Sequence, residues 1–299
     1  MARLETLGAP GLPAVWAEND DIGWTNVFAW LKTKRRERAL ATHALPDDEW
    51  SAALHELPFL DHYDATTLAR LRELTTLFLV EKSIVSGATS GDHKLEVTPH
   101  MRILIAVQAC LLILGRGDSV MAAMTDFEGW ENVVVYPGDF PRTCDFEDEA
   151  GVVHRLDEPI AGESWDGGPV LLSWSAIEAG YDETGMALVI HEFAHKIDML
   201  DGEVNGLPPV SGAARAAFKA SIDAAYDDFC RRVDAGEATA VDLYAAELIE
   251  EFFAVSCEVF FAEPDVLRVE YPVYFANLRS YFCVDTEQGC IILSPQNSL

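Results

Sequence analysis

The sequence predicts an α+β fold, in which helical segments enclose a small mixed sheet that has an edge strand. Two observations support this class. Apolar residues recur at helical spacing on both sides of the middle of the chain, and short apolar runs bounded by turn residues occupy the middle. The predicted order is helices, strands, a helix that carries two histidines, and then a mostly helical C-terminal part.

The first well-marked helix is expected over residues 64–82. Its leucines, such as Leu68 and Leu71, recur at the spacing of one helix face. A second helix is expected to begin with Thr98 as its cap and Pro99 in its first turn, and to run through an apolar stretch to Gly115. This stretch is too short to span a bilayer, so a buried helix is predicted.

Three strands are expected next, at "NVVVYPG" (132–138), "GVVHRL" (151–156) and "GPVLLSW" (168–174). The segment Pro169 to Trp174 is also a candidate edge strand, against which an extended peptide could pair. An ordinary buried strand is the alternative reading of that segment.

From Gly185 the pattern becomes helical again. Met186, Ile190, Phe193 and Ile197 are predicted to form one stripe that faces the core. The helix is expected to end near residues 201–202, where glycine is a common stop. The histidines His191 and His195 belong to this helix.

The chain is divided here into an N-terminal extension, residues 1–45, and one domain, residues 46–299. Within that domain, residues 46–202 hold helices, sheet and the histidine helix, and residues 203–299 form the helical remainder. The basic cluster at residues 32–38, "KTKRRER", is expected to be a solvated helix face rather than a nucleic-acid site.

The charge balance limits the classes of partner that the protein is expected to bind. Lys and Arg number 21 against 50 Asp and Glu, which gives a net charge of −29. Such a field repels nucleic acids and anionic membrane surfaces, so neither is expected as a partner. The six cysteines form no CxxC pair, and the start of the chain lacks a signal-peptide pattern. These features favour a reduced, cytoplasmic setting.

The chemistry-bearing motif is "HEFAH", residues 191–195. Residues four apart lie on the same helix face, so His191 and His195 can reach one ion. Zinc accepts imidazole nitrogens, and Glu192 is placed to act as a general base on metal-activated water. Glu192 also forms a favourable helical pair with Lys196, which is the purely structural alternative.

The third metal ligand is not fixed by spacing. Asp201 stands where some zinc proteases place their third ligand, although Asp198 replaces the glycine of that pattern. The other route uses a later, largely apolar helix that contains Glu251 and Glu258. Burying a lone carboxylate is costly, so a metal would account for one of them. Tyr244 lies seven residues before Glu251, near the same face if the helix extends that far.

The motifs "GPVLLSW", "HEFAHKIDMLDGEVNGLPP" and "YAAELIEEFFAVSCEVFF" resemble those of the Mlc titration factor A family of bacterial zinc peptidases. The resemblance covers about residues 45 to 285. It implies a zincin-like domain of the glutamate-zincin type, similar to the catalytic domain of anthrax lethal factor. It also implies one zinc ion held by His191, His195 and Glu251, with Glu192 as the general base and Tyr244 near the metal.

The function that the resemblance implies is hydrolysis of peptide bonds in a peptide or protein substrate. It includes aminopeptidase-like activity and a link to the regulation of sugar uptake. The alternative is a non-catalytic protein that sequesters a transcriptional repressor of the Mlc type. A third reading is a closed structural zinc site, which would leave Glu192 without a purpose. Asp198 and Glu258 are candidates to orient the histidines.

Overall fold

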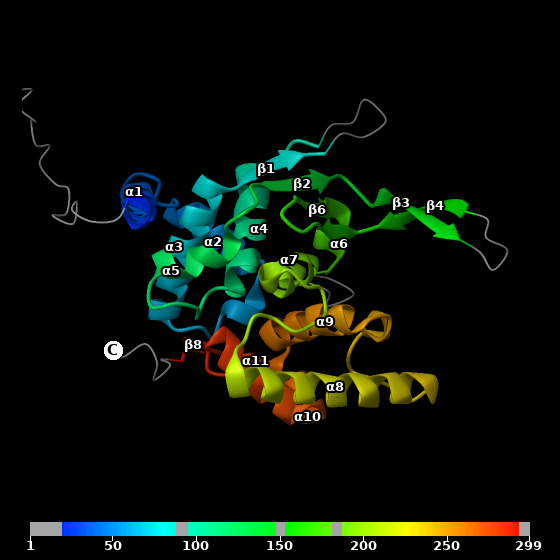
Figure 1. The fold of residues 1–299 in the computed structure, drawn as a ribbon. Coiled ribbons are helices and arrows are strands. Elements are labelled where there is room, and N and C mark those ends of the chain that lie inside the picture. The colour runs from blue at the N-terminus through cyan, green and yellow to red at the C-terminus, as the bar shows by residue number, and fades with distance from the viewer. Residues whose placement is uncertain (1–19, 88–94, 148–152, 181–186, 293–299) are drawn as a thin grey trace, which may run out of the picture.

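The computed structural model describes residues 20–87, 95–147, 153–180 and 187–292. Helices dominate both ends of the chain, and all strands of the main sheet lie between residues 83 and 173 (Figure 1). The helices are α1 (Asp20–Thr42), α2 (Asp47–His55), α3 (Ala65–Glu81), α4 (Pro99–Leu111), α5 (Val120–Ala123), α6 (Trp174–Ala179), α7 (Leu188–Asp198), α8 (Gly212–Asp234), α9 (Ile249–Ala262), α10 (Pro264–Glu270) and α11 (Pro272–Phe282). The strands are β1 (Ser83–Ser86), β2 (Asn132–Tyr136), β3 (Phe140–Glu147), β4 (Val153–Ile160), β5 (Gly162–Ser164), β6 (Val170–Ser173), β7 (Val284–Asp285) and β8 (Cys290–Ile291).

The main sheet is mixed, which confirms the predicted α+β class. Within the described chain it has four strands in the order β1-β2-β6-β5. β1, β2 and β6 run parallel, whereas β5 pairs antiparallel with β6, so that Gly162 lies opposite Leu172. Parallel strands in the interior of a sheet favour continuous Val and Leu runs, and this explains why β2 and β6 were predictable from the sequence.

Of the two readings of residues 169–174, the edge strand is wrong and the ordinary buried strand is confirmed. β6 lies between β2 and β5, with Val170 opposite both Val133 and Ser164. The backbone groups of β6 therefore pair with neighbouring strands on both sides, and β5 forms this edge of the sheet. β1 was not expected as a strand, because it follows α3 after a single residue and is only four residues long.

The strand predicted at residues 151–156 belongs to a separate hairpin. β4 pairs antiparallel with β3 over its whole length, and the two strands project from the body of the molecule (Figure 1). Residues 151 and 152 of the predicted segment lie outside the described residues. β4 leads directly into the edge strand β5, so the base of this hairpin lies beside the histidine helix described below.

Helix α7 runs through the centre of the fold, where all of its residues are buried. Ile190, Phe193 and Ile197 of the predicted stripe are fully buried, while Met186 lies outside the described residues. The ring of Phe193 packs against Phe78 and Trp130, at centroid distances of 5.7 and 5.6 Å. Apolar burial on this scale is the main force that fixes the position of the helix.

The predicted boundaries are confirmed at the start of α4 and at Gly202, whereas α4 ends at Leu111 and not at the predicted Gly115. The Thr98 side chain accepts a hydrogen bond from the main-chain N–H of Met101, and Pro99 opens α4. At the other end of the motif helix, a short 3₁₀ turn (Met199–Asp201) leads to Gly202, which has a φ of 86°. That left-handed conformation is favourable only for glycine, which explains why the helix stops there.

Helix α1 packs on α3 and carries the basic cluster. The prediction that this cluster is a fully solvated face is wrong at Arg36, which is only 4% exposed. Its guanidinium donates to both carboxylate oxygens of Glu81 and to the carbonyl of Met121. A buried guanidinium needs such partners, and helical periodicity cannot reveal them. The division of the chain at residue 45 stays a prediction.

Two further observations concern the described part of the chain. None of its helices combines the length and the apolar character that crossing a membrane requires. The five cysteines whose side chains are described are all free thiols.

Candidate metal centre

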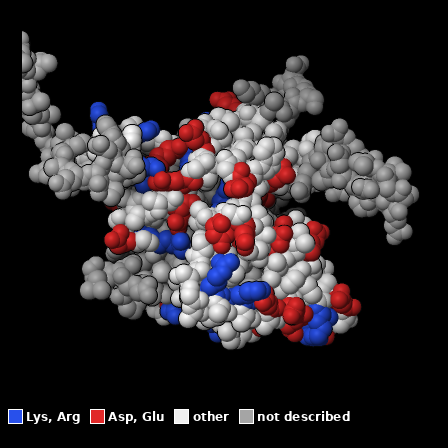
Figure 2. All heavy atoms as spheres, viewed as in Figure 1, with Lys and Arg blue, Asp and Glu red and all other residues white. Residues whose placement is uncertain are grey.

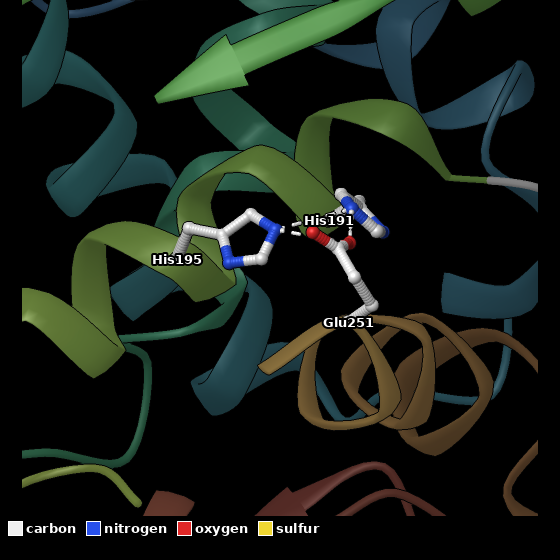
Figure 3. Close-up of side chains that lie close together, drawn as sticks. All are labelled: His191, His195 and Glu251. Carbon is white, nitrogen blue, oxygen red and sulfur yellow. Dashed lines mark hydrogen bonds and ion pairs between the residues drawn. The ribbon is translucent and has the colours of Figure 1, made fainter. Parts of the chain in front are cut away.

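Three potential ligand side chains converge at the centre of the fold. His191 and His195 project from one face of α7, and Glu251 reaches them from the first turn of α9 (Figure 3). His191 Nε2 lies 3.1 Å from Glu251 Oε2 and 3.2 Å from His195 Nε2. His195 Nε2 lies 3.4 Å from Glu251 Oε2. Within the described residues this is the one group of three or more such side chains with the spacing of a metal site.

The spacing of these atoms fits a tetrahedral zinc ion. Zinc binds imidazole nitrogen and carboxylate oxygen at roughly 2.0–2.1 Å, so two tetrahedral ligands lie roughly 3.3–3.4 Å apart. The three separations here, 3.1, 3.2 and 3.4 Å, fall at that value or slightly below it. Two nitrogens and one oxygen are also the donor set of catalytic zinc sites that keep one position open.

Helix packing brings Glu251 to the histidines. α9 packs directly against α7, and Phe252 to Glu258 of α9 are all buried. Glu251 is the last partly exposed residue before that buried run. The apolar residues therefore fix the depth of α9, and its first turn presents Glu251 to the imidazoles.

Glu258, two turns further along α9, holds one of the histidines. Its Oε1 lies 2.8 Å from His191 Nδ1, and its Oε2 accepts the main-chain N–H of Ala187 at 2.7 Å. Because Nδ1 is engaged in this way, the ring presents Nε2 to Glu251 and His195. The prediction left open whether Glu258 was a ligand or a support, and this geometry supports the second.

The pKa values of these groups depend strongly on one another. Burial lowers the pKa of His191, but hydrogen bonds with Glu251 and Glu258 raise it to about 10. Burial raises the pKa of Glu251, yet hydrogen bonds from His191 and His195 hold it well below its ordinary range. A metal ion at these atoms must therefore displace a proton, so its binding depends on pH.

Glu192, the expected general base, is buried beside the edge strand. The Ser164 hydroxyl lies 2.9 Å from Glu192 Oε2 and 2.7 Å from the Glu192 carbonyl oxygen. A hydroxyl has one hydrogen, so it donates to one of these oxygens at a time. Burial raises the pKa of Glu192, while His191, His195 and the Ser164 hydroxyl act in the opposite direction. Sequence reasoning did not identify Ser164.

A cleft of about 480 Å³ opens onto these groups. The edge strand β5 forms one wall, and the apolar residues Leu188, Met199, Val204 and Leu248 also line the cleft. Val204 and Leu248 are about half exposed, at 48% and 53%. Apolar side chains at the mouth of a cleft favour contact with an apolar ligand.

Tyr244 lies at the rim of the same cleft, but not on α9. It belongs to a 3₁₀ turn (Leu243–Ala246), and its ring centroid lies 6.0 Å from that of His191. The idea that α9 reaches back to Tyr244 is wrong, because Leu248 has an extended backbone, with φ −145° and ψ 157°. Tyr244 therefore reaches the cleft by a turn in the chain and not by helical periodicity.

The two aspartates after the motif lie elsewhere. Asp201 Oδ2 lies 3.3 Å from Arg215 Nη1, and Asp201 is not part of the three-residue group. Asp198 Oδ2 accepts the main-chain N–H groups of Asn205 and Gly206, both at 2.9 Å. Burial raises the pKa of Asp198 to about 6, although those N–H groups oppose the shift. Asp198 thus fixes the loop after α7, and its effect on His195 stays a prediction.

Comparisons with known proteins agree with this geometry. Residues 31–283 match the sequence model of a family described as glucose-regulated metallo-peptidase M90. The chain is 33% identical over 242 residues to a Mlc titration factor A of Klebsiella pneumoniae, which covers 80% of this chain and 87% of the relative. It is 31% identical over 253 residues to the Mlc titration factor A of Serratia proteamaculans, covering 84% and 92%. The resemblance stated from the motifs is confirmed, and the chain belongs to the glucose-regulated metallo-peptidase M90 family.

Proposed function

We propose that this protein is a zinc-dependent peptidase in which His191, His195 and Glu251 hold one zinc ion. The observation that carries the proposal is the triangle of ligand atoms, 3.1 to 3.4 Å apart, with the buried Glu192 carboxylate on the same helix and lining the same cleft. A closed structural site would have four protein ligands and no use for a neighbouring base.

Zinc, when bound, supplies Lewis-acid chemistry: it acidifies a coordinated water and polarises the scissile carbonyl. The residues of the chain perform the remaining tasks. Glu192 takes a proton at its carboxylate and returns it to the leaving amine. Tyr244, at the rim, donates a hydrogen bond to the oxyanion of the substrate. Glu258 keeps His191 oriented through Nδ1.

The substrate is proposed to be a peptide in extended conformation. β5 is the edge of the sheet and lines the cleft, and within the described residues no strand pairs with its outer side. An extended peptide can add there by main-chain hydrogen bonds. The apolar residues Val204 and Leu248 at the mouth favour an apolar side chain near the scissile bond. The aminopeptidase-like preference and the link to sugar uptake remain part of this proposal on the strength of the family resemblance, and the cytoplasmic location remains part of it on the strength of the cysteine usage.

The test is hydrolysis of fluorescein-labelled casein and of an internally quenched leucine-containing peptide. Glu192→Gln should keep its zinc and lose about 10²- to 10⁴-fold in turnover, the usual contribution of a general base. Glu247→Gln, a substitution at an exposed glutamate outside the cleft, is the matched control. Full turnover in Glu192→Gln would contradict the assignment of the base.

A second candidate function is binding of a transcriptional repressor without catalysis. The observation that favours it is the name of the relatives, Mlc titration factor A. The same variant separates the two functions. A binding protein would retain its cellular effect in Glu192→Gln, whereas a peptidase would lose that effect together with its turnover.

A further inference from the structure

The edge strand β5 contacts Glu192 at two of its three residues. Ser164, the last residue of the strand, places its hydroxyl 2.9 Å from Glu192 Oε2 and 2.7 Å from the Glu192 carbonyl oxygen. Both contacts join segments 28 residues apart in sequence. The strand therefore touches the side chain and the main chain of the proposed base at once.

Gly162, the first residue of β5, lies against the other carboxylate oxygen. A Cβ atom at this position would stand 2.2 Å from Glu192 Oε1 and 2.6 Å from Glu192 Cδ. Real Cβ atoms do not approach other heavy atoms so closely, so any larger residue would displace the carboxylate. Gly162 does not have a positive φ, which means that its lack of a side chain is needed for space and not for backbone conformation.

The strand is itself tied to the motif helix. Lys196, the residue after His195, donates from Nζ to the carbonyls of Trp165 and Gly168 in the β5–β6 turn. Lys196 is only 4% exposed, and burial lowers its pKa to about 8. The turn that follows Ser164 is thus fixed to the same helix that carries Glu192, so the end of the strand that carries the hydroxyl is held beside that helix.

We propose that β5 is a positioning element for the general base, in which Ser164 holds one oxygen of Glu192 and Gly162 leaves room for the other. A glutamate side chain has three rotatable bonds, and a proton-transferring carboxylate must be held within hydrogen-bond reach of its partner. Ser164 and Gly162 are positioning residues, because they act through Glu192. This inference rests on the proposed peptidase function only for its kinetic consequences.

The first test is a double-substitution cycle on stability, and it needs no activity. Gly162→Ala in the full-length, zinc-loaded protein should lower the Tm by at least about 3 °C, because the new methyl group displaces a carboxylate that is held by the Ser164 hydroxyl in a residue only 4% exposed. In the Glu192→Ala background the three clashing atoms are gone, so the same substitution should lower the Tm by less than about 1 °C. Gly138→Ala is the control, since a Cβ there meets only Ser175 Oγ at 3.5 Å.

The second test is kinetic, with the same casein and quenched-peptide substrates. Ser164→Ala should lower kcat by at least about tenfold, the effect of losing one hydrogen bond to a charged group, and leave KM and zinc content unchanged. Ser164→Thr keeps the hydroxyl and should restore most of kcat. Ser175→Ala, a substitution at an exposed serine of α6, should have no effect on kcat.

Two results would overturn the proposal. One is an equal loss of Tm for Gly162→Ala with and without the Glu192 side chain. The other is a kcat for Ser164→Ala equal to that of the wild type. If the wild type hydrolyses neither substrate, the proposed function fails, and the stability cycle alone decides whether β5 positions Glu192.

Discussion

At the scale of single residues, the carboxylates of the site differ in what they touch. Glu251 faces two imidazole Nε2 atoms, and Glu258 faces the Nδ1 side of His191 and a main-chain N–H. Glu192 contacts the edge strand. Three glutamates within the same small volume therefore have three different surroundings, and their expected roles as ligand, support and base follow from those surroundings.

Glu258→Gln is expected to weaken zinc binding by about 10- to 100-fold, the usual effect of removing a partner of a ligating histidine. Glu258 accepts two hydrogen bonds, from His191 and from the main chain of Ala187. A glutamine can accept only one of them, because its NH₂ group is a donor. Competition with a chromophoric zinc chelator measures the change. Unaltered affinity would show that His191 is oriented by other contacts.

Part of the site was predictable at this scale and part was not. The pattern of His191, Glu192 and His195 is local, since one helical turn brings its members together. The choice between Glu251 and Glu258 depends on how two helices pack, and spacing along one helix cannot supply that. Ser164 reaches Glu192 across 28 residues, and a lone serine carries no local signal.

At the scale of elements, the main correction is that the edge strand beside the cleft is β5 and not β6. β6 was predictable because it is an apolar run with three of its four residues buried, whereas β5 is three residues long and half-buried throughout. A hairpin signal was nevertheless present. Asp166-Gly167 stands between the two strands, and Gly167 has a φ of 58°. That turn indicates an antiparallel partner for β6 at residues 162–164, and the strand order places this partner at the edge.

The packing at the end of α3 can be tested through the pH dependence of the protein's stability. Lys82, the residue after the helix, donates from Nζ to the carbonyls of Phe127 and Trp130 and lies 3.7 Å from the centroid of the Trp130 ring. Burial lowers its pKa from 10.5 to about 8. Between these values the unfolded chain binds more protons than the folded protein, so the contribution of Lys82 to stability rises with pH from about 8 to about 10.5.

Across that pH window, the free energy of unfolding of the wild type is expected to rise by about 3 kcal/mol relative to that of Lys82→Met. This value follows from a pKa difference of about 2.5. Urea unfolding of both proteins at pH 7.5, 9 and 10.5 measures it. Comparison with the variant removes the contribution of buried tyrosines, which titrate at high pH in both proteins. A difference that stays constant with pH would show that the Lys82 ammonium is not desolvated.

At the scale of the whole molecule, the proposed metal joins two segments that are far apart in the sequence. His191 and His195 belong to the part that contains the sheet, and Glu251 belongs to the helical C-terminal part, where α8 to α11 pack together (Figure 1). Acidic side chains are spread over the visible face in Figure 2, in keeping with the net charge of −29. A divalent cation buried between these two segments would offset some of the repulsion among the acidic side chains. It would also bridge the two segments.

The most direct test of the account is the zinc content of the purified full-length protein, measured by inductively coupled plasma mass spectrometry for the wild type, Glu251→Ala and Asp201→Ala. The expected result is one zinc per chain in the wild type and in Asp201→Ala, and a clear loss in Glu251→Ala. Zinc retained in Glu251→Ala but lost in Asp201→Ala would contradict the proposed centre, because it would assign the third ligand to the motif helix instead of α9.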